Sequence, residues 1–180
     1  GVTFVVTPDN HHTIQDFFLD LDLSRLSAVS IEMQNYLTAA QHRHYARVAN
    51  DKFGVTATPS AAAYVRDPAV FANVDAESVA RQMRRVRDEC RQRGIRFFSQ
   101  PHTLESETIA AYLSADWTAM ADHHQRCALP WMYAEISARG DVTTCPSFYD
   151  ITIGNIYDHR LLDIWKGERA AEVRSHLRRE

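Results

Sequence analysis

The chain has 180 residues, of which 45% are hydrophobic, and its formal net charge is −3 at pH 7. These values are typical of a globular protein with one domain or two small ones, and no bulk positive charge calls for nucleic acid. No apolar run approaches the roughly eighteen residues of a membrane span, and no signal peptide is recognised. Three cysteines are far fewer than a disulfide scaffold needs, so we expect a reducing, cytoplasmic location.

Strand and helix patterns alternate along the first two thirds of the chain. Strands are predicted at residues 2–7, 26–33 and 95–99, and helices at 13–21, 36–50, 76–93 and 105–113. Residues 52–73 have no regular pattern. The clearest helix is 76–93, because Asp75 is a good N-cap and Gly94 a good terminator. This alternation predicts a parallel α/β sheet.

The last third contains a hairpin signal. Two β-compatible runs, 132–138 and 141–145, surround Arg139-Gly140, which predicts a two-residue loop with glycine at positive φ. Cys127 precedes the first run and Cys145 ends the second, so the hairpin brings both thiols to one end. A short apolar run, a predicted turn and a helix interrupted by a glycine follow at 151–153, Gly154-Asn155, 160–174 and Gly167.

The order Cys127, twelve residues, Gly140, four residues, Cys145 resembles the start of the SPASM and twitch domains of radical SAM enzymes. In those domains a cysteine, a glycine-containing hairpin and a second cysteine begin an auxiliary [4Fe-4S] site. The continuation of the family, GNI followed by IW and an arginine, is similar to residues 153–156, 164–165 and Arg174. The resemblance implies that Cys127 and Cys145 are ligands of an auxiliary [4Fe-4S] cluster.

The sequence departs from that family in two ways. The family supplies further cluster ligands downstream, whereas no cysteine follows Cys145. The CxxxCxxC motif that holds the S-adenosylmethionine-cleaving cluster is missing from a sequence whose only cysteines are 90, 127 and 145. Gly1 also begins directly in a strand pattern, as in an excised fragment. The resemblance therefore implies the C-terminal portion of an enzyme whose full-length form also binds S-adenosylmethionine and a second [4Fe-4S] cluster.

The same resemblance implies a fold class and a set of cofactor contacts. Residues 1–115 are expected to be the C-terminal part of a partial parallel (β/α) barrel, and residues 116–180 a truncated α+β module of hairpin plus helix. Chemistry in parallel barrels lies at the carboxyl ends of the strands. Polar residues follow the strands there, although turns are polar in any protein; they are Thr7, Asp9, Asn10, Glu32, Gln34, Asn35, Gln100 and His102. As contacts for S-adenosylmethionine or substrate we select Asn10, Glu32, Gln34, Gln100 and His102.

The cysteines also have simpler interpretations. Cys90 lies on the apolar stripe of the helix 76–93, where core packing is the favoured role. Cys127 and Cys145 are also compatible with a disulfide, with two unrelated thiols, or with a zinc site that includes His123 and His124. Three aromatic residues are expected either to keep a cluster dry or simply to form core, namely Trp131, Phe148 and Trp165.

The helix 76–93 is rich in arginine, with arginines at 81, 84, 85, 87, 91 and 93. Asp88 and Glu89 interrupt the run and no aromatic residues interleave, so a solvated outer helix is favoured over a nucleic-acid surface. Among the nine histidines only His102 is given a chemical role.

The sequence therefore predicts two alternative functions. The first is the C-terminal fragment of a radical SAM Fe-S oxidoreductase, not competent alone, whose partners are its missing N-terminal half and a peptide or small-molecule substrate. The second is a non-catalytic zinc or Fe-S module that docks a peptide or carrier. Neither nucleic acid nor a membrane is expected as a partner. Half a barrel leaves an unpaired edge strand at residues 2–7, where a second copy is expected to pack as a homodimer.

Overall fold

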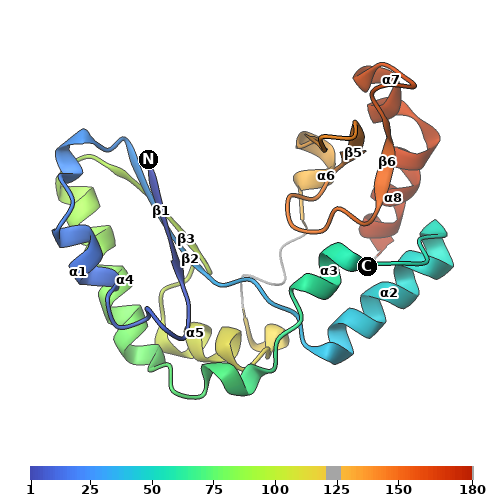
Figure 1. Ribbon diagram of the computed structural model, residues 1–180. Coiled ribbons are helices and arrows are strands. Elements are labelled where there is room, and N and C mark those ends of the chain that lie inside the picture. Colours follow the sequence, from blue (N-terminus) through green and yellow to red (C-terminus); the bar gives the residue numbers. More distant parts are fainter. Residues whose placement is uncertain (121–126, 180) are drawn as a thin grey trace. The chain divides into compact units, whose positions relative to one another are not determined.

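Figure 1 shows the computed structural model of the chain, which describes residues 1–120 and 127–179. The chain forms two compact units: unit 1 comprises Gly1–Tyr36 and Arg66–His124, and unit 2 comprises Leu37–Val65 and Gln125–Glu180. Each unit has its own three-stranded sheet and its own hydrophobic core.

Unit 1 contains the predicted parallel sheet. Its strands are β1 (Val2–Val6), β2 (Ala28–Met33) and β3 (Arg96–Gln100), in the order β1-β2-β3 with both pairings parallel. All three predicted strands are thus confirmed to within about two residues at their ends. Three parallel strands form a sheet and close no barrel, so the partial barrel stays a prediction.

Helices cover one face of this sheet, where α1 and α4 lie in Figure 1. The helices of unit 1 are α1 (Ile14–Leu19), α4 (Ala76–Gln92) and α5 (Ser106–Leu113), with 3₁₀ turns η1 (Leu23–Arg25), η2 (Pro68–Phe71) and η3 (Trp117–Ala119). Alternate strand residues such as Ile31 pack against the apolar stripe of α4, which includes Met83 and Cys90. Because successive side chains of a strand point to opposite faces, the other half of the strand side chains lies on the opposite face of the sheet.

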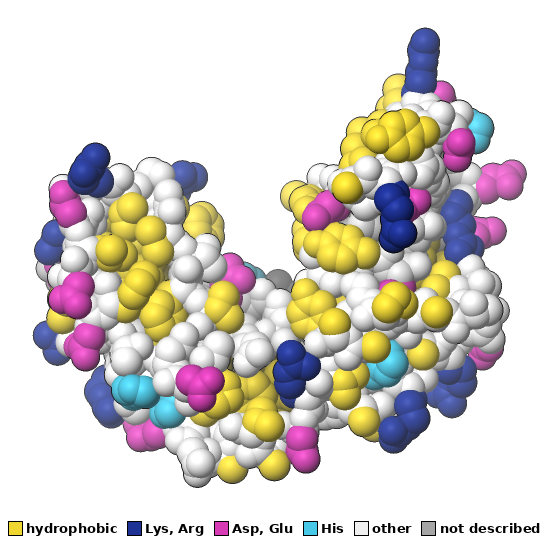
Figure 2. Space-filling view, in the orientation of Figure 1, with side chains coloured by type: hydrophobic (Ala, Val, Ile, Leu, Met, Phe, Trp, Pro, Cys, Tyr) yellow, Lys and Arg dark blue, Asp and Glu magenta, His cyan; other side chains and the backbone are white. Residues whose placement is uncertain are grey.

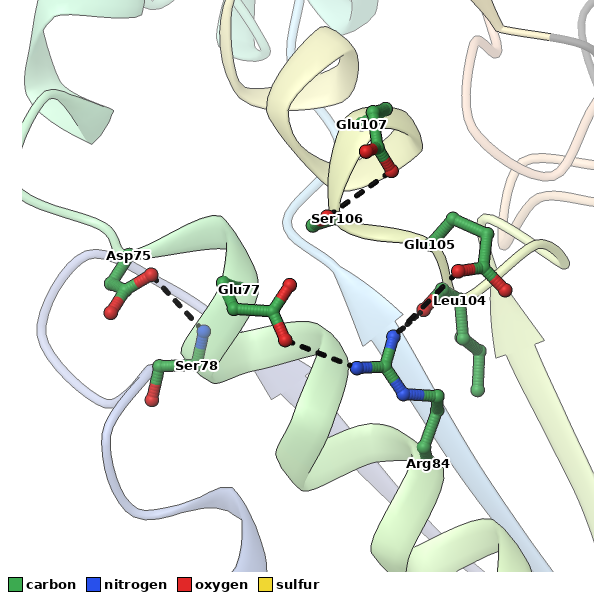
Figure 3. A network of polar contacts seen from close by, with 8 residues as sticks. All are labelled: Asp75, Glu77, Ser78, Arg84, Leu104, Glu105, Ser106 and Glu107. Carbon is green, nitrogen blue, oxygen red and sulfur yellow. Dashed lines mark hydrogen bonds and ion pairs between the residues drawn. The ribbon is translucent and has the colours of Figure 1, made fainter.

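The start of α4 is fixed by its cap and by Arg84 (Figure 3). The Asp75 carboxylate accepts a hydrogen bond from the Ser78 amide at 3.1 Å, as the sequence predicts. Arg84 Nη2 lies 3.2 Å from Glu77 Oε1, and Nη1 donates to Leu104 O at 2.7 Å. Arg84 therefore links α4 to the segment that leads into α5.

Arg87 in α4 and Arg93, the residue that follows α4, pair with carboxylates of this helix. Arg87 Nη2 lies 2.9 Å from Asp88 Oδ1, and Arg93 Nη2 lies 2.6 Å from Glu89 Oε1. These contacts are typical of a solvated helix face.

Unit 2 combines helices with an antiparallel sheet. Its elements are α2 (Ala39–Phe53), α3 (Pro59–Ala63), α6 (Leu129–Met132), β4 (Glu135–Ile136), β5 (Asp141–Thr143), β6 (Thr152–Asn155), α7 (Leu161–Lys166) and α8 (Glu168–Arg179), and the strand order is β4-β5-β6. Phe53 of α2 packs in one core with Val142, Ile153, Ile164 and Val173. Residues 37–65 are therefore part of this unit, whereas the sequence placed them in the barrel. The predicted division at residues 115 and 116 itself stays a prediction.

The hairpin forms where it was predicted, with two corrections. Met132 ends α6, so the first strand begins later than residue 132. The loop has three residues, 138–140, because Ser137 N donates to Asp141 O and Gly140 N donates to Ser137 O. Gly140 has φ 82°, as in three-residue loops that end in a left-handed residue.

Gly154-Asn155 was wrongly predicted to be a turn. Both residues lie in β6, with Gly154 opposite Val142 in the ladder. A Cβ at Gly154 would lie 2.8 Å from Ile164 Cγ2, so the glycine permits close approach of α7 to the sheet. The break near Gly167 is confirmed, since α7 ends at Lys166 and α8 begins at Glu168.

Several large hydrophobic side chains remain exposed in both units, and Figure 2 shows such side chains on the visible face of each. Val5 and Phe98 are about half exposed in unit 1, and Met132 and Tyr157 are largely exposed in unit 2. No helix among the described residues is both long and apolar enough to cross a bilayer.

Candidate functional site

Cys127 and Cys145 line the same cavity in unit 2, which has a volume of about 240 Å³. Its walls are mainly apolar and come from α2, α6 and α8, with Val48, Leu129 and Val173 as examples. All three cysteines of the chain are free thiols, so Cys127 and Cys145 do not form a disulfide here. The structure therefore brings together the two cysteines that the hairpin was predicted to bring together.

Cys145 is oriented by a tight turn of the backbone. The Phe148 amide donates a hydrogen bond to Cys145 Sγ at 3.3 Å, and the Cys145 amide donates to Thr143 Oγ1 at 3.4 Å. Backbone N–H groups that donate to sulfur are a common feature around the cysteine ligands of iron–sulfur clusters. Cys145 is half-buried and Cys127 is exposed, so the cavity has one anchored thiol and one accessible thiol.

Cys90 is separate from this cavity. It lies fully buried in the core of unit 1, where burial raises the pKa of its thiol. A neutral, enclosed thiol is a poor metal ligand, and core packing is the role that the structure supports.

Arg174 connects three helices of unit 2, of which α6 and α8 line the cavity. Arg174 Nε donates to Pro130 O at 2.8 Å, Nη1 donates to Trp165 O at 2.7 Å, and Cζ lies 4.2 Å from the centroid of the Trp165 ring. These contacts join α6, α7 and α8. Of the three aromatic residues expected to shield a cluster, Phe148 lines the cavity, whereas Trp165 stacks under this arginine.

His176 of α8 also lines the cavity and was missed from the sequence. His176 lies three residues after Val173, on the face of α8 that meets the cavity. Helical spacing from Val173 is the sequence signal that would have identified it. His123 and His124, the predicted partners of a zinc site, lie outside the described residues.

Two of the predicted cofactor contacts meet in unit 1. Glu32 pairs in register with Val5 on one side and with Gln100 on the other. Alternation puts all three on the sheet face opposite the core, at the carboxyl ends of the strands. Ser30 Oγ donates to Glu32 Oε1 at 2.9 Å and orients the carboxylate.

The other three predicted contacts lie in the segments after the strands. Asn10 uses its side chain within its own loop, because Oδ1 accepts from Thr7 N at 2.7 Å and Nδ2 donates to Val5 O at 2.9 Å. Gln34 extends the ladder through its amide, which donates to Val6 O at 2.9 Å. His102 is exposed, two residues after β3. The roles of all five residues as cofactor contacts stay predictions.

Both cysteines of the cavity lie in a segment that matches a known protein family. Residues 127–180 match the family model of SPASM, an iron–sulfur cluster-binding domain. The matched segment begins at Cys127 and contains the hairpin, Cys145, Trp165 and Arg174. Neither the curated proteins nor the solved structures that were compared with the chain gave a match.

The SPASM segment supports binding of an iron–sulfur cluster, and its residues fit part of that task. Soft thiolates are the usual ligands of such clusters, and an apolar shell keeps the cluster dry. A [4Fe-4S] cluster takes four cysteine ligands as a rule, and the cavity supplies two. Within residues 1–120 and 127–179, no group of three or more His, Cys, Asp or Glu side chains is arranged to hold a metal ion. The cavity thus gathers two thiols, fewer than a [4Fe-4S] cluster takes, and both belong to the segment that matches SPASM.

Proposed function

We propose that this chain is the C-terminal part of a radical SAM Fe-S oxidoreductase. In this proposal Cys127 and Cys145 hold an auxiliary [4Fe-4S] cluster, and unit 1 contributes part of the cleft for S-adenosylmethionine and substrate. The observation that carries the proposal is the shared cavity of the two cysteines within a segment that matches SPASM.

The residues of the cavity have separate tasks in this proposal. Cys145 is the pre-oriented ligand, because the Phe148 amide already faces its sulfur. Cys127 is exposed in the same cavity and would be the second ligand. Apolar residues of α2 and α8 exclude water. When bound, the cluster supplies one-electron transfer or a coordination site for substrate.

In this proposal the other metal ligands of the enzyme belong to residues outside this chain. The sequence has no CxxxCxxC motif and no cysteine after Cys145, so the S-adenosylmethionine-cleaving cluster and the other auxiliary ligands come from elsewhere in the full-length protein. Free thiols and an iron–sulfur centre both suit a reducing cytoplasm.

Unit 1 offers hydrogen-bonding groups for the proposed cleft. The Glu32 carboxylate accepts hydrogen bonds from hydroxyl or ammonium groups, and the Gln100 amide both donates and accepts. They are neighbours on the face of the parallel sheet opposite the core, near the strand ends where such sheets bind ligands.

The proposal is tested first by metal analysis of the full-length protein, purified anaerobically. We expect iron and acid-labile sulfide in equal amounts, with more of both than the CxxxCxxC cluster alone accounts for. A variant lacking all three CxxxCxxC cysteines is expected to retain iron and sulfide. Zinc without sulfide in that variant would support the alternative, a non-catalytic metal module that docks a peptide or carrier.

The proposed cleft is tested by calorimetric binding of S-adenosylmethionine. Glu32→Ala and Gln100→Ala are each expected to weaken binding about tenfold, the effect of one charge-assisted hydrogen bond of about 1.4 kcal/mol. Thr3→Ala is a matched control, because Thr3 lies on the same sheet face but toward the amino ends of the strands. Equal affinities in all three variants would contradict the assignment of the cleft.

A further inference from the structure

We infer that the segment 37–65 positions the Cys145 ligand, with Asp150 as the positioning residue, and thereby sets the reduction potential of the cluster. This inference rests on the proposed function, since it assigns a role to residues around that cluster. The match to SPASM covers only residues 127–180, so nothing in it assigns a role to α2 or α3.

Asp150 connects the turn after Cys145 to α3. Its Oδ1 accepts a hydrogen bond from Ser60 N at 2.8 Å, and its Oδ2 accepts one from Ala61 N at 2.9 Å. Tyr45 OH of α2 also donates to Oδ2, at 3.4 Å. One carboxylate thus joins the cysteine turn to two helices that lie about ninety residues or more earlier in the sequence.

Ser60 provides a second connection to the same turn. Its Oγ donates to Ser147 O at 3.2 Å and accepts from Tyr149 N at 3.1 Å. These two bonds hold the backbone on both sides of Phe148. Ser60 therefore restrains the residue whose amide faces the cysteine sulfur.

The Phe148 side chain is held by rings of the same segment. Its ring centroid lies 5.4 Å from that of Tyr45 and 5.4 Å from that of Tyr64, with the second pair close to perpendicular at 86°. On the other side of the turn, Tyr149 OH donates to Glu135 Oε1 at 3.0 Å. Rotation of the Phe148 amide away from Cys145 Sγ would therefore disturb contacts with α2, α3 and β4.

The hydrogen bonds of Asp150 in this junction are partly buried. Burial, followed by the Asp150 charge, raises the pKa of Tyr45, so its hydroxyl stays a donor throughout the ordinary pH range. Hydrogen bonds to cluster sulfurs raise the reduction potential, because they stabilise the more negative reduced state. Loss of the Phe148 N–H bond should then make the cluster harder to reduce.

The test measures the midpoint potential of the auxiliary cluster by EPR-monitored titration in the full-length protein. Asp150→Ala is expected to retain iron and sulfide while reduction becomes about tenfold less favourable, a fall of about 59 mV. Asp150→Asn keeps one acceptor oxygen and should restore part of the shift. Asp67→Ala is the matched control, because Asp67 caps a turn of unit 1 through Ala69 N at 2.9 Å.

A second variant, Ser60→Ala, is less disruptive than Asp150→Ala and serves as the test if Asp150→Ala unfolds the protein. Ser60→Ala removes both hydroxyl contacts without removing a charge, and it should lower the potential in the same direction. A second readout uses protein freed of metal, where Asp150→Ala should speed alkylation of Cys145 and leave the rate at Cys127 unchanged.

Failure of this inference differs from failure of the proposed function. If the wild-type protein holds no auxiliary iron and sulfide, the proposed function fails. If it holds them, and neither Asp150→Ala nor Ser60→Ala shifts the potential or the alkylation rate of Cys145, the positioning role of 37–65 is overturned. If Asp150→Ala loses the cluster, the potential of Ser60→Ala decides the question by the same criterion.

Discussion

Arg174 links α8 to α6, and both helices line the cavity. Two of its nitrogens donate to carbonyls of Pro130 and Trp165, and its guanidinium stacks on the Trp165 ring. We expect Arg174→Ala to lower the free energy of unfolding by roughly 2–3 kcal/mol, since two charge-assisted hydrogen bonds and a cation–π contact are lost. Nη2 is buried without a hydrogen-bond partner among the described residues. The cost of burying this unpaired nitrogen disappears in Arg174→Ala, so the loss of unfolding free energy is smaller than the sum of the lost contacts.

Urea denaturation measures that change, and Arg178 supplies the control. Arg178 is on the same helix and lies over Trp131 at 5.6 Å, a weaker contact. Arg178→Ala should cost less than about 1 kcal/mol. Equal losses in the two variants would show that the carbonyl contacts of Arg174 contribute nothing.

Tyr36 stabilises unit 1, and this stabilisation is lost at alkaline pH. Its buried hydroxyl donates to Tyr112 O and Leu113 O, both at 2.9 Å, and burial raises its pKa to about 12. An unfolded tyrosine ionises near pH 10, so the folded state binds this proton more tightly. The stabilisation is complete below pH 10 and is lost as pH rises from 10 through 12.

The measurement is the urea midpoint between pH 8 and pH 12. The wild-type midpoint should fall more steeply above pH 10 than that of Tyr36→Phe, which lacks this titrating group. Tyr157→Phe is the control, because Tyr157 is 76% exposed. Parallel curves for wild type and Tyr36→Phe would exclude the predicted linkage.

At the scale of the element, the β4–β5 hairpin depends on Gly140. Gly140 has φ 82°, and a Cβ there would lie 2.6 Å from Tyr157 Cδ2 and 2.7 Å from Asn155 Oδ1. Gly54, at the end of α2, has φ 65° with open space around the same position. Both substitutions to alanine incur the cost of left-handed backbone, about 1–2 kcal/mol, but only Gly140→Ala adds overpacking.

Gly140→Ala should therefore destabilise the protein by roughly 1–3 kcal/mol more than Gly54→Ala. Chemical denaturation of the two variants under one condition measures the difference. If Gly54→Ala proves as costly as Gly140→Ala, packing around the hairpin turn has no part in its stability.

The same elements show where local sequence information ends. The apolar strands and the Asp75 cap could be predicted from the sequence because both follow from local residue patterns. The loop length at Gly140 was not, because a glycine at positive φ ends both two-residue and three-residue hairpin loops. Gly154 was misassigned because a glycine that permits packing, here against Ile164, has the same local signature as a glycine in a turn.

At the scale of the whole molecule, the sequence predicted the two cysteines and, among the residues around them, Phe148, but not the contacts that hold this region together. The cysteine spacing and the hairpin are local features, and a family resemblance strengthens them. Asp150, Ser60 and His176 belong to no motif, and the first two meet only because 37–65 folds into unit 2. Contacts between residues ninety positions apart depend on tertiary packing, which single-sequence patterns do not report.

The parallel sheet also supports a prediction about association. Among the described strands β1 pairs only with β2, in the order β1-β2-β3, and Val5 on β1 is 45% exposed. An edge strand tends to pair with another chain, and a lysine there opposes such pairing. We expect this 180-residue chain to associate at high concentration through residues 2–6, and Val5→Lys to reduce that association.

Light scattering across a concentration series tests the association, with hydrogen exchange at residues 2–6 to locate it. Leu19→Lys is the control, because Leu19 is 59% exposed on α1 and lies outside the sheet. A monomer at every concentration, with rapid exchange throughout β1, would contradict the predicted edge pairing.

The most direct measurement of the central claim is the iron and sulfide content of single cysteine variants of the full-length protein, in a background without the CxxxCxxC cysteines. Cys127→Ser and Cys145→Ser should each lose most of the bound iron and sulfide, since both thiols line the one cavity. Cys90→Ser should retain them, because Cys90 lies in the core of unit 1. Full retention of iron and sulfide in both Cys127→Ser and Cys145→Ser would contradict the account.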